Sequence, residues 1–252
     1  MTSACVLVFD FDGTVSLGDE PVVAYARHLD EEAGSATGLI TRVVSRFLQC
    51  DGRLDRALEG LTDADPVFLG LHVIDGAIDG YAAAARLATL IGLQQAQIDA
   101  AYTASRADLA DGLISTRAPE GFASFLAAFP PGAHRVLVSN SPANGLIEQI
   151  DKLGLTRSFD EVVTSANKPA GLPAILERLL AEHGLADAPD RLLSVGDIWV
   201  NDLAPAAQLG AATALIDRMP VPEGAAPTVR APQIEELYPW MLDWASGRAD
   251  RT

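Results

Sequence analysis

The stretch VLVFDFDGTV, residues 6–15, begins as a continuous apolar run and ends with Asp10, Asp12, Gly13 and Thr14. An apolar run too short for a helix predicts a strand that is buried on both faces, as in a parallel sheet. Side chains two residues apart in an extended segment face the same way, so Asp10 and Asp12 should point toward one place. Gly13 suits a sharp turn there, and the Thr14 hydroxyl offers a local hydrogen bond. An Asx turn that only closes the strand is the structural alternative.

Four more short apolar runs follow later in the chain, with helical patterns between them. The runs are RVLVS, EVVTS, LLSVG and ATALI, at 135–139, 161–165, 192–196 and 212–216, and the helical patterns lie at 142–153, 171–183 and 201–209. Strands alternating with helices predict an α/β fold with a Rossmann-like parallel sheet. The aromatic-rich segment 231–247 is expected to be a final packing helix, and 248–252 a frayed tail.

About a hundred residues separate the first strand from the second, and almost none of them has a strand pattern. Apolar residues instead recur at helical spacing in four segments, 21–29, 38–48, 79–93 and 95–110. The sequence therefore predicts an all-helical domain at 17–114, inserted into a core domain formed by 1–16 and 115–252.

Composition limits the classes of partner. The 252-residue chain has a formal net charge of −16, which disfavours nucleic acid and anionic membrane surfaces as partners. Cys5 and Cys50 form neither a metal-binding spacing nor a disulfide framework, and the apolar segment 81–93 is too short to span a bilayer. We therefore expect a soluble, cytoplasmic protein, with its oligomeric state left open.

Polar residues with chemical capacity follow the later strands. Ser139 and Asn140 follow the second run, Lys168 follows the third, and Asp197 and Asp202 follow the fourth. Taken singly, a strand-end serine or aspartate is more often a helix cap, and a lone lysine more often a solvated charge. Because parallel strands end at one edge of a sheet, the set together predicts a single site with an acid pair, hydroxyl and amide groups, and a cation.

These four motifs, in this order over residues 5–202, resemble those of the haloacid dehalogenase (HAD) superfamily of hydrolases. The segment KPAGLPAIL, which begins at Lys168, is similar to the lysine-proline pattern of its first subfamily. The inserted helical block is similar in position to the C1 cap of that subfamily. The resemblance implies the HAD fold, with a cap that closes over a small substrate.

The resemblance also implies roles for the residues. Asp10 would be the nucleophile that forms an aspartyl phosphate, and Asp12 the general acid and base. Ser139, with Asn140, and Lys168 would bind the phosphoryl oxygens. The function implied is hydrolysis of a small phosphorylated metabolite, that is, an enzyme of the phosphoric monoester hydrolase class.

A magnesium ion completes the implied site. Asp10, the backbone carbonyl of Asp12 and Asp197 would bind Mg²⁺, with Asp202 and Thr14 in supporting positions. Charge gives independent support, because Asp10, Asp197 and a phosphate dianion carry about four negative charges, while Mg²⁺ and Lys168 return about three. Without the metal, an anionic substrate should be repelled.

Alternatives within and outside the superfamily remain open. A dehalogenase does not need Asp12 as a proton donor, and a Schiff-base phosphonate hydrolase needs a cap lysine, which 17–114 lacks. A phosphomutase shares all four motifs. Receiver-like signalling domains also combine an aspartate, a hydroxyl, a lysine and Mg²⁺, and a non-catalytic relative is the last alternative. The sequence does not identify the substrate or the residues that select it.

Overall fold

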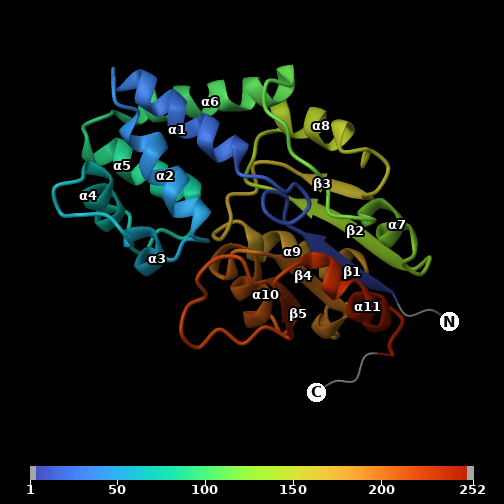
Figure 1. Ribbon diagram of the computed structural model, residues 1–252. Coiled ribbons are helices and arrows are strands. Elements are labelled where there is room, and N and C mark those ends of the chain that lie inside the picture. The colour runs from blue at the N-terminus through green and yellow to red at the C-terminus, as the bar shows by residue number, and fades with distance from the viewer. Residues whose placement is uncertain (1–3, 249–252) are drawn as a thin grey trace. The chain divides into compact units, whose positions relative to one another are not determined.

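The computed structural model describes residues 4–248 and contains a six-stranded sheet whose neighbouring strands all run parallel (Figure 1). The strand order is β3-β2-β1-β4-β5-β6, so the first strand lies inside the sheet and the chain crosses over on either side of it. This doubly wound arrangement is the one that alternating strands and helices predict. The strands are β1 Cys5–Phe9, β2 Ala133–Val138, β3 Glu161–Val163, β4 Leu192–Gly196, β5 Ala212–Ile216 and β6 Val229–Ala231.

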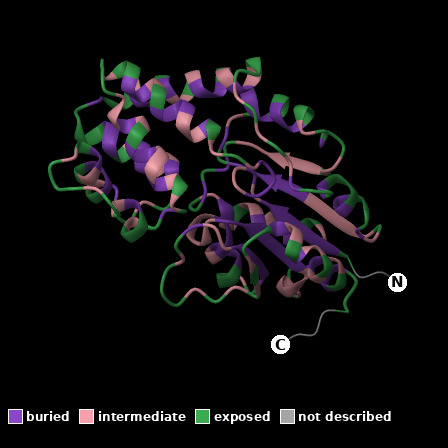
Figure 2. Ribbon diagram, in the orientation of Figure 1, coloured by how far each residue is buried: buried purple, intermediate pink, exposed green. Residues whose placement is uncertain are grey.

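Burial explains the continuous apolarity of the inner strands. Every residue of β1, β4 and β5 is buried (Figure 2), as a sheet covered on both faces requires. The edge strands β3 and β6 have three residues each and are only partly buried. In the register of the sheet, Phe9 is level with Leu137 on one side and Val195 on the other. The residues that follow β1, β2 and β4 therefore emerge at the same edge.

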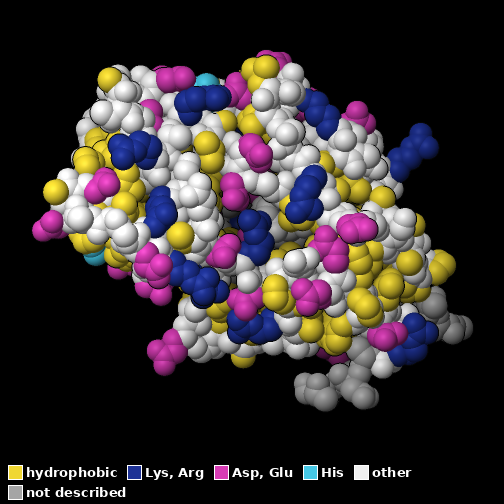
Figure 3. All heavy atoms as spheres, in the orientation of Figure 1, with side chains coloured by type: hydrophobic (Ala, Val, Ile, Leu, Met, Phe, Trp, Pro, Cys, Tyr) yellow, Lys and Arg dark blue, Asp and Glu magenta, His cyan; other side chains and the backbone are white. Residues whose placement is uncertain are grey.

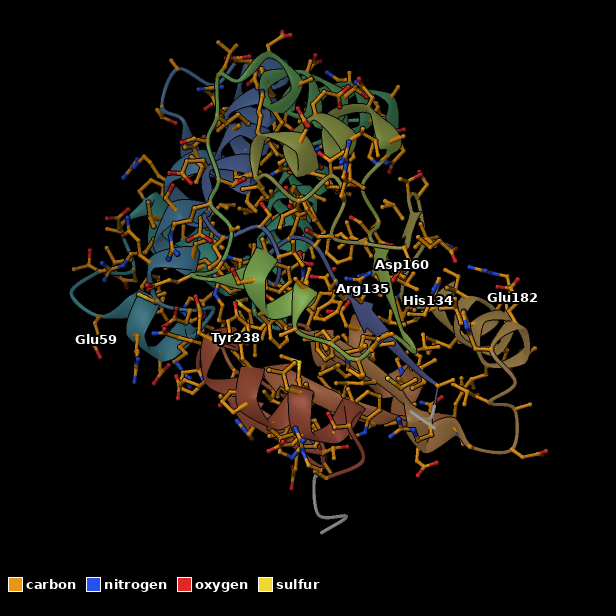
Figure 4. All side chains as sticks on the ribbon, turned by 90° about the vertical axis from the view of Figure 1, so that its right-hand side faces the viewer. Glu59, His134, Arg135, Asp160, Glu182 and Tyr238 are labelled. Atoms are coloured by element: carbon orange, nitrogen blue, oxygen red, sulfur yellow. The ribbon has the colours of Figure 1, made fainter. Side chains whose placement is uncertain are left out.

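Helices cover both faces of this sheet. Side chains of α7, α8 and α11 share a core with Leu7 and Phe9, whereas α9 and α10 pack with Val6 and Val8 on the other face. The helices are α7 Phe122–Ala127, α8 Ala143–Lys152, α9 Leu172–Glu182, α10 Ala204–Gln208 and α11 Ile234–Ala245. The aromatic residues of α11 are packing residues, as predicted: Tyr238, labelled in Figure 4, stacks on a phenylalanine of α7 with ring centroids 4.0 Å apart.

Parts of the core unit differ from the sequence expectation, and helix α7, with six residues, was not predicted. Strand β6 was not predicted, because three partly exposed residues are too short for a recognisable pattern. The helix expected at 201–209 is a π-helical turn, η2 (Trp199–Leu203), followed by α10. Pro205 lies in the first turn of α10, where its missing N–H costs no intrahelical hydrogen bond, so α10 begins there as a separate helix. Of the predicted tail, 249–252 lies outside the described residues.

The chain separates into two compact units. One comprises the residues up to Leu17 and those from Arg117 onward, and the other is Gly18–Thr116. The expected boundaries, after 16 and 114, fall one and two residues before these. Leu17 and Arg117 pair through two backbone hydrogen bonds of 2.8 and 3.0 Å, so the two connecting segments leave the core unit side by side.

The second unit, which we call the helical unit, contains six helices in its described residues and no strand. They are α1 Glu20–Glu32, α2 Leu39–Gln49, α3 Leu54–Leu58, α4 Pro66–Val73, α5 Gly80–Leu90 and α6 Gln95–Asp111. Its interior holds Arg106, which is 1% exposed and packs over the rings of Tyr81 and Tyr102. Helices α3 and α4 were not predicted, because five and eight residues give too short a period to detect.

No helix in the described part of the chain has both the length and the apolarity needed to cross a bilayer.

Candidate active site

The carboxyl ends of three adjacent strands bring the predicted residues together. Asp10 directly follows β1, Ser139 directly follows β2, and Asp197 directly follows β4. The backbone N–H of Asp10 donates to Val195 O at 2.9 Å, which continues the β1–β4 pairing up to the aspartate. Because β1 lies between β2 and β4, the three residues meet at the edge where open parallel sheets bind ligands.

The ammonium group of Lys168 lies between two carboxylates at this edge. Its Nζ donates to Asp10 Oδ1 at 2.5 Å and to Asp202 Oδ1 at 2.7 Å. The side chains of Lys168 and Asp202 are each 4% exposed, and that of Asp10 is 11% exposed. Burial acts to lower the pKa of Lys168, but the charges and hydrogen bonds of Asp10 and Asp202 outweigh it and raise that pKa. Lys168 is therefore held as a cation beside Asp10.

The side chain of Asn140 is hydrogen-bonded to the main chain of Lys168. Its Nδ2 donates to the Lys168 backbone carbonyl at 3.1 Å, and its Oδ1 accepts from the Lys168 backbone N–H at 2.5 Å. The amide thus grips the main chain of Lys168 from both sides. The binding of phosphoryl oxygens by Asn140 stays a prediction, and the structure adds that its amide fixes the loop that carries the lysine.

Asp12 is joined to the loop after β2 by a residue that sequence reasoning missed. The hydroxyl of Ser141 donates to Asp12 Oδ2 at 3.2 Å, and the Ser141 backbone N–H donates to Ser139 Oγ at 3.1 Å. Both serines are buried. The only sequence signal was the second serine in the run SNSP, and nothing in its spacing connects it to an aspartate 129 residues earlier.

The turn after Asp12 shows why glycine and threonine are there. Gly13 has φ +89°, and a Cβ added to it would lie 2.2 Å from Asp197 Oδ2, so the Asp197 carboxylate occupies the space a side chain would need. Thr14 is fully buried, and its hydroxyl makes no hydrogen bond among the described residues. The local hydroxyl bond expected of Thr14 is therefore wrong; its backbone N–H instead closes the turn onto Phe11 O at 3.3 Å.

A second cation also approaches this turn. Arg218 lies two residues beyond the end of β5, and its Nη1 donates to the Gly13 carbonyl at 3.4 Å. No role was predicted for Arg218, although its place after a strand is a signal of the same kind as that for Lys168.

The residues at this edge fit a hard divalent cation. Asp10, Asp197 and Asp202 each offer one carboxylate oxygen within 4.8 Å of the other two. Oxygen donors of this kind suit Mg²⁺. Both oxygens of Asp202 accept hydrogen bonds, from Lys168 Nζ and from the Ile198 backbone N–H at 3.1 Å. This favours Asp10 and Asp197 as ligands, with Asp202 acting through Lys168; the carbonyl of Asp12 stays a predicted ligand.

The acidic cluster is electrostatically strained without a further cation. Burial raises the pKa of Asp202 to about 7, against the opposing effect of Lys168, and the neighbouring charge of Asp10 adds to the rise. Elsewhere, on the face shown in Figure 3, acidic and basic side chains are interspersed. Asp197 and Asp202 are buried and Asp10 is partly buried at the sheet edge, and a metal ion bound there would relieve the repulsion between their charges.

Comparison with known proteins bears on the fold. No family model matches the chain, and no curated protein matches it. Solved structures do: YfnB from Bacillus subtilis, described as a HAD-hydrolase and bound to magnesium, matches at TM-score 0.59 with 19% identity over 94% of this chain and 98% of its own. A predicted phosphoglycolate phosphatase from Haemophilus somnus matches at TM-score 0.56 with 18% identity, over 85% of this chain and 86% of its own. A 2-haloacid dehalogenase from Pseudomonas syringae matches at TM-score 0.53 with 16% identity, over 96% of this chain and 99% of its own.

These likenesses show that the chain has the fold of the haloacid dehalogenase superfamily, with its Rossmann-like parallel sheet. The HAD fold that the four sequence motifs imply is therefore confirmed. Identities of 16–19% establish the fold alone. The similar structures include both a predicted phosphatase and a dehalogenase, so activity must be argued from the side chains at the sheet edge.

Proposed function

We propose that this protein is a Mg²⁺-dependent phosphatase that hydrolyses a small phosphorylated metabolite through an aspartyl-phosphate intermediate on Asp10. One observation carries the proposal: the Asp10 carboxylate is 2.5 Å from the buried ammonium of Lys168, and a second acid, Asp12, held by Ser141, follows two residues later. A nucleophile, a cation and a separate proton donor are the groups that phosphoryl transfer to a carboxylate requires.

The first half-reaction uses both aspartates. A carboxylate oxygen of Asp10 forms a bond to phosphorus as the bond from phosphorus to the ester oxygen breaks. Asp12 gives its proton to that oxygen, so the alcohol leaves neutral. Lys168 and Ser139 bind the phosphoryl oxygens, on which negative charge accumulates.

The second half-reaction returns the enzyme to its starting state. Asp12, now ionised, takes a proton from water as the water oxygen attacks phosphorus, and the bond between phosphorus and the Asp10 oxygen breaks. Inorganic phosphate leaves, Asp10 is again a carboxylate, and Asp12 again carries a proton.

Magnesium would be held by Asp10 and Asp197 with the carbonyl of Asp12. When bound, it neutralises the negative charge that the phosphoryl group brings to an edge already crowded with carboxylates. Asp202 supports the site by holding Lys168 at 2.7 Å. We expect excess chelator to abolish turnover and added Mg²⁺ to restore it.

The helical unit is proposed to act as the cap. It is inserted between Leu17 and Arg117, whose pairing makes the two connections adjacent, an arrangement that suits a hinge. A cap of this kind would exclude water and restrict the substrate to a small molecule. Side chains of the cap would select that substrate. We propose that the protein works in the cytoplasm, the compartment expected from its composition.

A dehalogenase is the second candidate, because a 2-haloacid dehalogenase is among the similar structures. Asp12 argues against it, since a halide leaves as a stable anion and needs no proton donor. A phosphomutase shares the proposed chemistry and differs in the acceptor of the phosphoryl group.

The test is a release assay with purified protein. Phosphorylated metabolites are screened with Mg²⁺ for inorganic phosphate, and 2-chloropropionate is screened for chloride in parallel. The Asp10→Asn variant, similar in size but a poor nucleophile, is the matched control. Phosphate release that disappears in this variant supports the proposal. Chloride release without phosphate release, or phosphate release that persists in Asp10→Asn or in excess chelator, contradicts it.

A further inference from the structure

We infer that Ser141 is a positioning residue for the general acid, and that it decides which oxygen of Asp12 carries the transferable proton. The inference rests on the proposed phosphatase function. Its starting point is the hydrogen bond from the Ser141 hydroxyl to Asp12 Oδ2, 3.2 Å long, in a serine that is only 3% exposed.

The main chain holds this serine in place from both sides. Its backbone N–H donates to Ser139 Oγ at 3.1 Å, and its carbonyl accepts from the Ser165 backbone N–H at 2.9 Å. Ser165 belongs to the loop after β3, so the loops that follow two neighbouring strands are cross-linked at Ser141. The hydroxyl is therefore presented to Asp12 from a fixed backbone.

Three successive residues of this loop serve three different parts of the site. Ser139 is the proposed phosphate ligand at the end of β2. Asn140 grips the main chain of Lys168 at 3.1 and 2.5 Å, and Ser141 reaches Asp12. The loop after β2 thus sets the cation and the proton donor relative to each other. A loop that served only to cap α8 would not need hydrogen bonds to both Lys168 and Asp12.

The bond has a chemical consequence for Asp12. A protonated carboxyl group has one O–H donor and one oxygen that only accepts. A carbonyl oxygen is a much better acceptor than a carboxyl O–H oxygen, so a hydrogen bond donated by Ser141 to Oδ2 favours the form of Asp12 that carries its proton on Oδ1. During transfer the proton on Oδ1 passes to the ester oxygen, while the serine keeps its own proton. In the second half-reaction Oδ1 takes the proton from water, and Ser141 again stays unchanged.

Loss of the hydroxyl should matter only where a proton is needed. A poor leaving group, such as the alkoxide of glycerol 2-phosphate, must be protonated as it departs, whereas 2,4-dinitrophenolate leaves as a stable anion. We expect Ser141→Ala to lower kcat/KM for glycerol 2-phosphate by about tenfold, the scale of one hydrogen bond, and for 2,4-dinitrophenyl phosphate by less than about twofold. kcat/KM is the correct parameter because it covers only the steps up to departure of the alcohol.

The variants separate positioning from folding. Ser141→Thr keeps the hydroxyl and should restore activity toward glycerol 2-phosphate, whereas Ser141→Cys keeps the volume with a weak donor and should behave like Ser141→Ala. Asn140→Ala is the comparison variant, because it loosens the lysine loop without removing either hydrogen bond that holds Ser141, and it should lower kcat/KM for both esters alike. Thermal unfolding of each variant checks the fold, and Ser141→Cys carries the comparison if Ser141→Ala does not fold.

The result that supports the inference is a selective loss for glycerol 2-phosphate in Ser141→Ala or Ser141→Cys, with recovery in Ser141→Thr. Equal losses for the two esters, or no loss for either, would overturn it while leaving the phosphatase proposal intact. If the wild-type protein releases phosphate from neither these esters nor the metabolite panel, the proposed function fails, and the inference fails with it.

Discussion

Replacing Lys168 with methionine should destabilise the core unit through charge. Lys168→Met removes the cation that lies 2.5 Å from Asp10 and 2.7 Å from Asp202, and it leaves two carboxylates that are 11% and 4% exposed without this partner. Breaking a buried ion pair by removing one member costs about 3–5 kcal/mol. For a chain of this length, a loss of about 3 kcal/mol lowers the Tm by about 6–12 °C.

The pH dependence has a definite sign. Asp202 already has its pKa raised to about 7 in the folded protein, above the 3.8 of an ordinary aspartate. Such a group favours the folded state at low pH, and this contribution is lost as the pH rises through the folded pKa. Without the lysine the pKa rises further. The Tm difference between wild type and Lys168→Met should therefore be larger at pH 8 than at pH 5, and Mg²⁺ should reduce it.

The assay is thermal unfolding by circular dichroism at both pH values, with chelator present and then with Mg²⁺. Lys152→Met is the matched control, since Lys152 is the only other lysine in the sequence and is exposed, and it should change the free energy of unfolding by less than about 0.5 kcal/mol. Adding Asp202→Asn to Lys168→Met should recover part of the loss. A Lys168→Met variant as stable as wild type at pH 8 would refute the charge argument.

Three other predictions concern separate parts of the molecule. Gly13→Ala places a methyl group 2.2 Å from Asp197 Oδ2, on a backbone with φ +89°. It should lower the free energy of unfolding in urea by at least about 2 kcal/mol and kcat by tenfold or more. A fully active variant would contradict this. Burial and the adjacent His134, labelled in Figure 4, lower the pKa of His183. This group therefore stabilises the fold above pH 6.5, and the contribution is lost as the pH falls. His183→Gln should flatten the decline in Tm from pH 7 to 5, and an unchanged slope would count against this. Asp30 accepts three hydrogen bonds at the start of α2, and Asp30→Ala should cost about 1–2 kcal/mol while Asp30→Asn costs less; equal stability of both variants and wild type would show the cap to be inert.

Much of the fold could be predicted because its signals are local. Strands β1, β4 and β5 are fully buried, so each carries an unbroken apolar run; β4 and β5 have the bounds that their runs predict, and β1 ends at the predicted residue. The helices and strand that were missed, β6, α3, α7 and α4, have three, five, six and eight residues, too few for a period to show. The helix expected at about 201–209 is confirmed, since 199–208 is helical throughout, but its division into a π-helical turn and α10 gives no signal in the periodicity.

The sequence alone determined which residues stand at strand ends: an extended segment and a buried run suffice to place Asp10, Asp12, Ser139 and Asp197 at one edge of a parallel sheet. Only the tertiary structure decided which atoms meet there. Lys168 reaches Asp10 across 158 residues, and Ser141 reaches Asp12 across 129. Such contacts depend on strand register and on the path of each loop, which no periodicity encodes. For the same reason, the sequence did not show that the Asn140 amide holds the lysine loop or that the Thr14 hydroxyl is buried.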